Sequence, residues 1–424
     1  MLEQASNEYL TRTGPGTPMG ELFRNFWVPF LMSSELPEPD CPPVRVRLLS
    51  EDLVAFRDTN GKVSLIDAQC PHRLAPLFFG RNEECGLRCV YHGWKFDGEG
   101  NCVDMPNEPA ESNFKHKINI KAYPTYERGG LVWAYMGSED KIPQLPDLEW
   151  ATVPDSHRYI MKYLVEGNYM QCMEGDIDSS HASFLHSSLD NRLMNSGLSV
   201  SDRTQKLWME NKNPSFFVKE HDYGLLIGAR RNATASTYYW RITQWLMPFY
   251  SIIPAEIGDS ILCNVRIPID DHHSWHIRIM WHPERPLTDK EHYAYKHVGV
   301  FYPERIPGTF TSVANKENDY LIDRHEQKHK SYTGIKAVPV QDMAMFEGMG
   351  PVVDRPREHL GTSDTAIIQV RRILLKTANQ MEEGKLPYSA YNGAGYKARS
   401  ASVEMPNEVE FEVGAKEYLT AQKW

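Results

Sequence analysis

The sequence contains no run of apolar residues that approaches the roughly 20 residues a helix needs to span a bilayer. It also lacks an excess of positive charge, because 46 lysines and arginines stand against 56 aspartates and glutamates, for a formal net charge of −10. A nucleic-acid partner is therefore not expected, since binding phosphates requires a basic face. Residues 1–11 mix charged and polar side chains and contain no apolar stretch of the kind found in secretion signals. Together these absences predict a cytoplasmic protein that binds neither membranes nor nucleic acids.

Cysteine is scarce, with seven residues scattered over the chain. An odd set of this kind in a cytoplasmic chain argues against a disulfide framework and leaves metal binding or simple burial as explanations. A lone cysteine such as Cys263, in an apolar run, is expected to be a small core residue.

A chain of 424 residues is too long for one ordinary hydrophobic core, so two domains are expected. Residues 1–40 are interpreted as a helical lead-in with an apolar and aromatic segment from Phe23 to Leu31. Short β-like runs then indicate a small all-β domain over residues 41–145, with Asn60-Gly61 as a tight hairpin turn. The expected strands are Val44–Leu49, Leu53–Phe56, Val63–Ile66 and Leu131–Tyr135.

Residues 146–424 mix strand and helix patterns, and they predict a larger domain of the α+β class. Thr362 and Ser363 lie where the last predicted helix needs a cap, and Gly384 lies just past its end. The tail after Pro387 is rich in turn residues and predicts no element. The expected strands are Phe216–Val218, Tyr238–Trp245, Ser260–Ile267 and Trp275–Trp281, and the expected helices are Met170–His186 and Asp364–Met381.

One stretch combines two cysteines and two histidines at close spacing. Cys70-Pro-His72 is followed by sixteen residues and then by Cys89-Val-Tyr-His92-Gly-Trp94. On neighbouring hairpin loops, two such pairs can converge on one metal centre, because thiolates and imidazoles both bind iron and zinc. In a Rieske [2Fe–2S] cluster two cysteines hold one iron and two histidines hold the other. The pattern therefore predicts a [2Fe–2S] cluster bound by Cys70, His72, Cys89 and His92.

A structural zinc ion bound by the same four side chains is the alternative. Zinc fingers pair cysteine with cysteine and histidine with histidine, whereas each loop here carries one of each. Two irons require that arrangement, with one cysteine and one histidine supplied by each loop. Cys85 has no histidine three residues later, as Cys89 has, and is not expected to be a ligand.

A second motif, from Glu174 to His186, separates an enzyme from an electron carrier. Asp178 and His181 are three residues apart and would share a helical face, but His186 lies five beyond His181, about 140° further around an ideal helix. Both imidazoles can therefore meet one metal ion only if the helix is distorted there or ends. Two histidines and one carboxylate are the ligands of O₂-activating non-haem Fe(II), so the motif predicts a mononuclear iron held by His181 and His186.

The carboxylate ligand of this iron must come from elsewhere in the chain. Spacing alone does not distinguish the candidates, which are Asp323, Asp342, Glu347 and Asp354. Of these, Asp354 is interpreted with Arg355 and Glu358 as part of a structural ion-pair cluster.

The first motif, with its tyrosine, glycine, tryptophan and phenylalanine, resembles the Rieske domain of aromatic-ring oxygenases: Tyr91, Gly93, Trp94 and Phe96 carry this likeness. The segment from Val340 to Gly361 is similar to the same region of phthalate 4,5-dioxygenase-like oxygenases, a branch that also includes aryl-ether dioxygenases and aromatic O-demethylases. The resemblance extends over nearly the whole chain, from Thr13 to Asp364.

This resemblance implies roles for individual residues. Cys70 and Cys89 would bind one iron of the cluster, and His72 and His92 the other. In the branch, the aspartate that follows a glutamine is the third ligand of the mononuclear iron, which selects Asp342. The aspartate three residues before the first histidine, here Asp178, would bridge His181 to a cluster histidine of the neighbouring subunit and couple the two centres.

The resemblance also implies a fold and partners. The fold is a small all-β Rieske domain followed by a larger catalytic domain with an antiparallel sheet flanked by helices, of the helix-grip or START-like type. Members are homo-oligomers built on trimers without β subunits, and they draw electrons from NADH through a separate reductase that carries flavin and a plant-type [2Fe–2S] centre. The expected reaction uses O₂ to oxidise an aromatic acid, giving a cis-diol from an arene or formaldehyde and a phenol from a methoxyarene.

The sequence leaves the substrate open. Phthalate-oxidising members grip the carboxylates with basic residues, but at the corresponding positions, near Gln205–Leu207 and Thr243–Trp245, Lys206 is the only basic side chain. That departure counts against phthalate itself. The remaining candidate carboxylate partners are Arg203, Arg230, Arg231 and Arg241.

Two other functions stay open on the sequence. Within enzymes, the alternative is a Rieske monooxygenase that acts on a steroid or an alkaloid. Outside enzymes, it is a non-catalytic electron carrier, which would require His181, His186 and Asp342 to be incidental.

Overall fold

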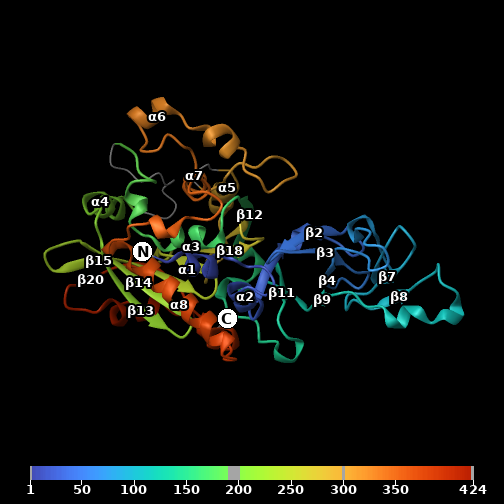
Figure 1. Cartoon of the computed structure of the whole chain (residues 1–424). Coiled ribbons are helices and arrows are strands. Elements are labelled where there is room, and N and C mark those ends of the chain that lie inside the picture. Colours follow the sequence, from blue (N-terminus) through green and yellow to red (C-terminus); the bar gives the residue numbers. More distant parts are fainter. Residues whose placement is uncertain (1, 190–200, 298–300, 422–424) are drawn as a thin grey trace. The chain divides into compact units, whose positions relative to one another are not determined.

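Residues 2–189, 201–297 and 301–421 are described by the structure, a computed structural model (Figure 1). The chain divides into two units, of which one comprises Thr13–Leu145 and the other comprises Met1–Arg12 together with Pro146–Trp424. Among the helices of the described residues, none combines the length and the apolar character that crossing a membrane requires.

The Thr13–Leu145 unit, drawn in blue to teal in Figure 1, consists of short antiparallel strands in three small sheets. The sheet orders are β1-β11-β10, β2-β3-β4-β9 and β5-β6-β7-β8. Its helix is α2 (Pro18–Arg24), and its strands are β1 (Trp27–Met32), β2 (Val44–Leu48), β3 (Glu51–Arg57), β4 (Val63–Asp67), β5 (Arg81–Glu83), β6 (Gly86–Arg88), β7 (Lys95–Phe96), β8 (Cys102–Asp104), β9 (Ala122–Tyr123), β10 (Thr125–Arg128) and β11 (Leu131–Tyr135).

Sequence alternation explains these strands. In β2, Val46 and Leu48 are buried while Arg45 and Arg47, which alternate with them, are exposed, as a half-buried strand requires. Gly61 has a φ of +85° and donates its N–H to Asp58 O at 2.9 Å, which closes the hairpin turn between β3 and β4. The four strands predicted for residues 41–145 are therefore confirmed as β2, β3, β4 and β11.

The residues predicted as a helical lead-in, 1–40, are divided between the two units. Helix α1 (Gln4–Thr11) packs in the larger unit, where Tyr169 Oη donates to Leu10 O at 2.7 Å. The apolar stretch Phe23–Leu31 ends α2 and forms β1, which pairs antiparallel with β11 from Trp27 opposite Tyr135 onward. A strand forms there because its apolar side chains are buried against the neighbouring strand, a tertiary effect that helical periodicity does not register.

The larger unit is built on a nine-stranded sheet with the order β12-β19-β18-β16-β15-β14-β13, in which β20 pairs with β15 and β17. All pairs are antiparallel except β17 with β20. The strands are β12 (Arg158–Val165), β13 (Ser215–His221), β14 (Gly224–Asn232), β15 (Thr237–Leu246), β16 (Tyr250–Ile253), β17 (Ala255–Glu256), β18 (Ile261–Pro268), β19 (Ser274–Trp281) and β20 (Ala401–Pro406).

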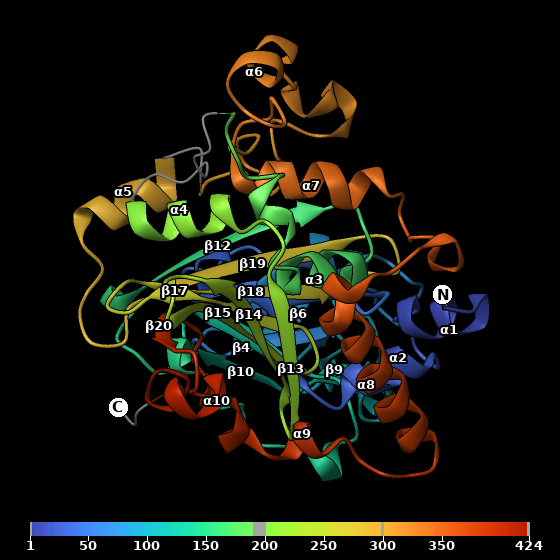
Figure 2. The same cartoon turned by 90° about the vertical axis from the view of Figure 1, so that its left-hand side faces the viewer.

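Helices cover this sheet (Figure 2). Helix α3 packs on β16 and β18, α8 packs on β13 and β14, and α3 also contacts α7 and α8. The helices of this unit besides α1 are α3 (Tyr169–Ile177), α4 (Asp202–Glu210), α5 (Asp289–His297), α6 (Arg324–His329), α7 (Val338–Gly348), α8 (Thr365–Glu382), α9 (Tyr388–Tyr391) and α10 (Phe411–Gly414). The predicted α+β class, with an antiparallel sheet flanked by helices, is therefore confirmed.

The four strands predicted for this unit are confirmed as parts of β13, β15, β18 and β19. Helix α8 occupies the predicted position, but Asp364 rather than Thr362 or Ser363 is its N-cap residue, after a short 3₁₀ turn. The tail after Pro387, whose turn-rich sequence predicted no particular element, supplies β20. The predicted helix Met170–His186 is too long, because α3 ends at Ile177.

Candidate active site with two metal-binding clusters

The two Cys/His loops of the smaller unit share one backbone conformation. Cys70 donates its N–H to the carbonyl five residues later and accepts a hydrogen bond from the N–H four residues later, and Cys89 does the same. The fourth residue after each cysteine, Leu74 in one loop and Gly93 in the other, has positive φ, at +58° and +84°. Two loops of the same shape thus present their ligands toward one place, as the sequence predicts.

Gly93 is required by space as well as by its φ. A Cβ at this position would come within 2.6 Å of Pro106 Cγ. Only glycine fits such an approach without a shift of the neighbouring loop, which explains the glycine in the motif. Leu74 adopts the same region of φ at an exposed position, where its side chain meets no such obstacle.

The four predicted ligands lie together. The rings of His72 and His92 are 4.4 Å apart, centroid to centroid, and His72 stacks on Trp94 at 4.4 Å. Cys70 and Cys89 are buried side by side, and burial with the neighbouring Cys89 raises the pKa of the Cys70 thiol to about 11. The Cys70 thiol therefore needs a metal to hold it as a thiolate.

The donor geometry fits a two-iron cluster better than a single zinc ion. Four ligands of one zinc ion would lie within about 4 Å of one another. Within the described residues, no three of these four side chains offer donor atoms that all lie within 4.8 Å of each other. Nδ1 of His72 is buried without a hydrogen-bond partner, as expected for an atom that serves as a ligand.

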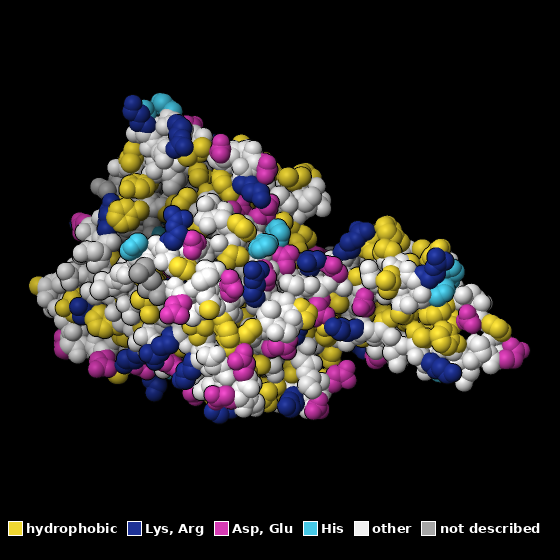
Figure 3. Space-filling view, in the orientation of Figure 1, with side chains coloured by type: hydrophobic (Ala, Val, Ile, Leu, Met, Phe, Trp, Pro, Cys, Tyr) yellow, Lys and Arg dark blue, Asp and Glu magenta, His cyan; other side chains and the backbone are white. Residues whose placement is uncertain are grey.

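The rim of these loops is apolar and exposed. Leu74, Val90 and Tyr91 are each more than half exposed, and Arg73 lies over the Tyr91 ring at 5.6 Å. Figure 3 shows histidine side chains at the surface of this unit, next to hydrophobic ones. Cys85 takes no part in the cluster and instead accepts a hydrogen bond from Asn60 Nδ2 at 3.1 Å.

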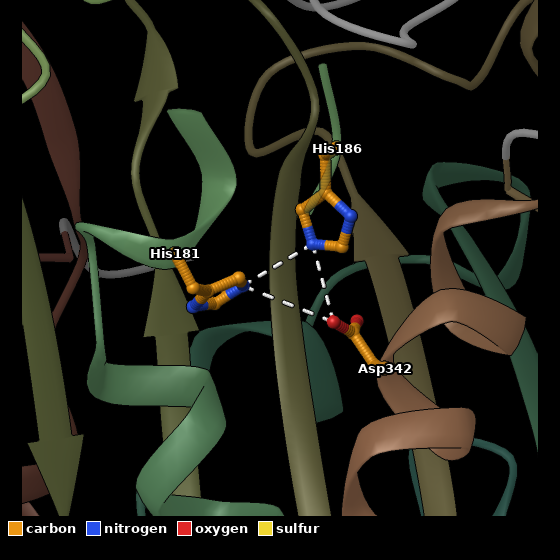
Figure 4. Close-up of side chains that lie close together, drawn as sticks. All are labelled: His181, His186 and Asp342. Carbon is orange, nitrogen blue, oxygen red and sulfur yellow. Dashed lines mark hydrogen bonds and ion pairs between the residues drawn. The ribbon is translucent and has the colours of Figure 1, made fainter. Parts of the chain in front are cut away.

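The second cluster forms where α3 ends. Because the helix stops at Ile177, the chain turns through Asp178 into a single 3₁₀ turn that begins at His181, and His186 follows at the end of that loop. Because the helix ends before His181, the two imidazoles are not held about 140° apart, as they would be on an ideal helix. Figure 4 shows His181, His186 and Asp342 pointing toward one another, with Asp342 reaching them from helix α7.

Three atoms face a common point. Nε2 of His181 lies 3.2 Å from Nε2 of His186, and Oδ1 of Asp342 lies 3.1 Å from Nε2 of His186 and 3.8 Å from Nε2 of His181. This is the one group of three or more potential ligands with donor atoms within 4.8 Å of one another in the part of the chain that the structure describes. Asp342 Oδ1 is buried without a hydrogen-bond partner. A set of two imidazoles and one carboxylate of this kind suits Fe(II).

Hydrogen bonds orient both imidazoles. Oδ2 of Asp178 lies 3.3 Å from Nδ1 of His181, and Nδ1 of His186 lies 2.7 Å from Oε1 of Gln341. Gln341 is held in this orientation because its Nε2 donates to Ile335 O at 2.8 Å. Both histidines therefore carry their proton on Nδ1 and leave Nε2 free for a metal. Gln341 was not predicted as a site residue, although its place next to Asp342 was a usable signal.

The charges of the cluster stabilise one another. Burial opposes ionisation of Asp342, but the imidazoles of His186 and His181 outweigh it and lower the pKa of the carboxyl. Burial likewise opposes protonation of His181, but the hydrogen bond to Asp178 and the charge of Asp342 raise the pKa of its imidazole. These interactions keep a carboxylate in the site, which favours the binding of a cation.

The other candidate carboxylates lie elsewhere. Asp323 caps α6 and accepts hydrogen bonds from the backbone N–H groups of residues 325 and 326. Glu347 accepts from Tyr320 Oη at 2.5 Å and from Glu166 N at 2.9 Å. Asp354 is exposed and lies 3.9 Å from Arg357. Among the four candidates, the structure brings only Asp342 to the two histidines.

The predicted ion-pair cluster of Asp354, Arg355 and Glu358 is wrong in its pairing. Arg355 is fully buried and pairs with Glu174 at 2.9 Å. Arg371, on helix α8, binds both Glu174 and Glu358 at 2.6 Å and so links the Arg355–Glu174 pair to Glu358. The network therefore ties α3 to α8, which the local spacing of Asp354, Arg355 and Glu358 could not reveal.

Two arginines next to the metal-binding triad have no acidic partner in the part of the chain that the structure describes. Arg231 on β14 and Arg241 on β15 both lie over the Trp208 ring, at 5.0 and 4.2 Å, and no carboxylate lies within 4 Å of either among the described residues. Burial lowers the pKa of each guanidinium to about 10. The charge of Arg241 acts on His181, and Arg231 reaches Ser179 O at 3.4 Å, so both border the triad.

The other predicted carboxylate partners are occupied or exposed. Arg203 pairs with Glu404, Lys206 is exposed and lies 3.8 Å from Glu210, and Arg230 stacks on the Tyr238 ring at 4.3 Å. Among the predicted pocket aromatics, Trp245 belongs to the core, where its Nε1 donates to the sulfur of Met173.

Comparison with known proteins identifies both parts of the chain with described families. The Rieske [2Fe–2S] domain family matches residues 26–124, and the family described as LigXa C-terminal domain like matches residues 134–403, more than half of the chain.

Three oxygenase subunits are similar to this chain over most of its length. The chain is 38% identical to the phthalate 4,5-dioxygenase oxygenase subunit of Pseudomonas putida, with 91% of this chain and 88% of that protein covered. It is 37% identical to the 3-chlorobenzoate-3,4-dioxygenase oxygenase subunit of Comamonas testosteroni, with 97% and 98% covered. It is 32% identical to the 5,5'-dehydrodivanillate O-demethylase oxygenase subunit of a Sphingobium strain, with 91% and 83% covered.

Proposed function

Because this chain belongs to the Rieske non-haem iron oxygenases, as an oxygenase subunit of the phthalate 4,5-dioxygenase-like branch, we propose that it oxidises an aromatic acid. The reaction is ring dihydroxylation or oxidative O-demethylation, with O₂ as co-substrate. The observation that carries the proposal is the convergence of His181, His186 and Asp342 in a chain that also holds the Cys/His loops. A simple electron carrier needs no second iron site, so this alternative is not supported.

Each metal site has a donor set that fits its group. Cys70, His72, Cys89 and His92 would hold the Rieske [2Fe–2S] cluster, and His181, His186 and Asp342 would hold the mononuclear iron. When bound, the cluster delivers electrons and the iron activates O₂. The protein's own part is to fix the protons of the histidines, through Asp178 and Gln341, so that Nε2 of each ring faces the site.

The paired arginines support an acidic substrate. Among the described residues, Nη1 of Arg231 and Nε of Arg241 are buried without a hydrogen-bond partner, and the charge of Arg241 acts on His181. A buried cation without a counter-ion is costly. A carboxylate bound there would neutralise the pair and place the aromatic ring next to the metal site. Steroids and most alkaloids carry no such group, so the pair argues against them as substrates.

A separate redox partner and an oligomer complete the proposal. We propose a homotrimer, or stacked trimers, in which Asp178 also accepts a hydrogen bond from a cluster histidine of the neighbouring subunit. Electrons would come from NADH through a reductase with flavin and a plant-type [2Fe–2S] centre. The expected cytoplasmic location belongs to the same proposal.

The test is a panel of benzoates, phthalates and methoxybenzoates with the iron-loaded protein and a surrogate reductase. We expect NADH consumption above the substrate-free rate with at least one acid, together with a diol or a phenol plus formaldehyde as product. Arg241→Met should raise the KM for that acid by roughly 10–100-fold, the loss expected for a charge-assisted hydrogen bond, with little change in iron content. Fully loaded protein that oxidises none of these acids, but oxidises a neutral steroid or alkaloid, would overturn the proposal.

A further inference from the structure

Polar atoms without hydrogen-bond partners gather under helices α3 and α7, on one face of the large sheet. In the part of the chain that the structure describes, they are Tyr163 Oη, both ring nitrogens of His276, Nε of Arg278, Nη1 of Arg266 and Oδ1 of Asn264. All five side chains are buried. Buried polar groups in folded proteins are nearly always hydrogen-bonded, so six unpaired atoms in one place indicate a partner that is not part of the chain.

Strand register shows that the five side chains share a face. Tyr163 of β12 is directly opposite His276 of β19, which is directly opposite Arg266 of β18. Arg278, two residues along β19, is opposite Asn264. Directly paired residues, and residues two apart on one strand, project from the same face of a sheet. Helix α3 covers this face, because both Arg266 and Asn264 bind Asp176 of that helix, at 2.7–2.8 Å.

The cluster borders the metal-binding triad. Tyr163 packs in one hydrophobic cluster with Met343 and Phe346 of helix α7, the helix that carries Asp342. Burial raises the pKa of the Tyr163 phenol, and the charges of Arg278 and Asp342 also act on it. The guanidinium of Arg266 lies over the Phe346 ring at 5.3 Å. The unpaired atoms thus lie between the sheet and the helix that supplies the carboxylate ligand.

The cluster carries one more positive charge than negative charge. Arg266 is neutralised by Asp176 at 2.7 Å, whereas no carboxylate lies within 4 Å of Arg278 among the described residues. The hydrogen bond that Arg278 Nη1 makes, to Phe301 O, is long at 3.4 Å. Burial and the charges of Arg266 and Arg278 hold the pKa of His276 well below its ordinary value, so its ring is neutral. An anionic oxygen group would complete this set of donors.

We propose that Arg278, His276 and Tyr163 form a subsite that binds a carboxylate group of the substrate. The inference rests on the proposed oxidation of an aromatic acid and adds that the preferred acid carries a second carboxylate. One carboxylate would bind at Arg241, near His181, and the other at Arg278, near Asp342. Arg278 on β19 and Arg241 on β15 project from the same sheet face and are separated by strands β18 and β16, so two separate cationic groups border the metal-binding triad.

The test is direct binding, measured by calorimetry on the iron-loaded protein without reductase. Benzoate is the probe with one carboxylate, and phthalate, isophthalate and terephthalate are the probes with two. We expect at least one dicarboxylate to bind more than roughly tenfold tighter than benzoate, since a charge-assisted hydrogen bond contributes about that factor or more. In Arg278→Met this preference should vanish while benzoate affinity stays near the wild-type value.

Equal affinity of the wild type for benzoate and all three dicarboxylates would overturn the proposal and leave ordered water as the partner of these atoms. An unchanged preference in Arg278→Met would overturn it as well. These outcomes are separate from a failure of the proposed oxidation, which shows only in turnover with reductase.

Thermal unfolding distinguishes a binding role from a structural one. If the role of Arg278 is to bind a ligand, Arg278→Met removes a buried charge that has no counter-ion, and Tm in the absence of acid should stay the same or rise. Arg266→Met is the matched control on the neighbouring strand, and it should lower Tm because it leaves the Asp176 carboxylate buried without its cationic partner. A similar loss of Tm in both variants would show that Arg278 is structural. His276→Gln, which keeps a donor and an acceptor, should retain part of the dicarboxylate preference.

Discussion

Oδ2 of Asp178 lies 3.3 Å from Nδ1 of His181, on the opposite side of the imidazole from the nitrogen that faces His186 and Asp342. Burial opposes ionisation of Asp178, but hydrogen bonds from His181 and Ser180 outweigh it and lower the pKa of the carboxyl to about 2. Asp178 is therefore a carboxylate at any physiological pH, and it holds the proton of His181 on Nδ1.

We expect Asp178→Asn to bind both metal groups fully and to slow electron delivery to the mononuclear site at least roughly tenfold, the usual scale for losing an outer-shell partner. Asparagine is nearly isosteric, so packing should survive, but it lacks the charge that holds the imidazole N–H groups. The measurement is a single turnover with pre-reduced protein, an aromatic acid and O₂, following re-oxidation of the Rieske absorbance.

Ser180→Ala is the control for this variant. It removes the hydroxyl that donates to Asp178 Oδ1 at 2.6 Å, but leaves the carboxylate and the backbone donor of Ser180 in place. Re-oxidation should remain close to the wild-type rate. If metal-replete Asp178→Asn also re-oxidises at the wild-type rate, Asp178 merely ends helix α3, and the proposed link between subunits has to be abandoned.

His181→Ala, His186→Ala and Asp342→Ala should each lose the mononuclear iron and all turnover while the visible Rieske spectrum persists, because the two sites have no ligand in common. Iron analysis and the visible spectrum of each purified variant provide the test. Glu347→Gln is the matched control on the same helix, since Glu347 is bound to Tyr320 and Glu166 rather than to the triad. Loss of iron in the control with retention in Asp342→Ala would show that the ligand is misassigned.

Cys70→Ser and His92→Ala should abolish the visible spectrum and the acid-labile sulfide, because each removes a ligand of the cluster. Cys85→Ser should keep both, since its sulfur only accepts a hydrogen bond from Asn60. Wild-type protein purified without air should contain about two irons and two sulfides per chain for the cluster and one further iron. Stoichiometric zinc and no visible band would exclude the cluster.

Gln341→Leu should weaken binding of the mononuclear iron by roughly 10–100-fold while leaving the Rieske spectrum intact. The side chain is fully buried, and its loss removes the acceptor at 2.7 Å from Nδ1 of His186. Iron retention during dialysis against graded chelator gives the affinity. Gln341→Glu keeps an acceptor in the same place, so it should hold iron better than the leucine variant. Equal retention in wild type and Gln341→Leu would exclude Gln341 from the site.

Glu174→Ala should lower the free energy of unfolding by about 3–5 kcal/mol, because it leaves Arg355 and Arg371 buried without their common partner. Urea unfolding followed by tryptophan fluorescence measures this. Arg372→Ala, one residue further along helix α8, removes an exposed pair at 3.9 Å and should change stability little. Similar small losses in both variants would contradict a structural role for the buried network.

The amino-acid sequence alone was enough to predict the ligands of the two proposed metal sites. Ligand spacing is a local property, so these motifs can be recognised without knowledge of the fold. They are Cys70-Pro-His72, Cys89-Val-Tyr-His92 and the segment from Asp178 to His186. The spacing of His181 and His186 even required the helix to end between them or to be distorted, and α3 does end at Ile177. Strands such as β11 and β19 could also be predicted from local sequence. The residues of β11 are uniformly apolar, and in β19 apolar residues alternate with polar ones.

Features that depend on long-range contacts could be recognised only in the folded chain. The local pattern offered four carboxylates for the iron, and only the packing of α7 against α3 brings Asp342 to the histidines while Tyr320 and Glu166 occupy Glu347. Strand β20 and the partners of Arg355 were not predicted, since each depends on residues more than a hundred positions away. Among the described residues, Arg241 and Arg278 have no acidic partner, and this too could not be predicted from the sequence, because a missing counter-ion can be recognised only after folding has brought the neighbours into place.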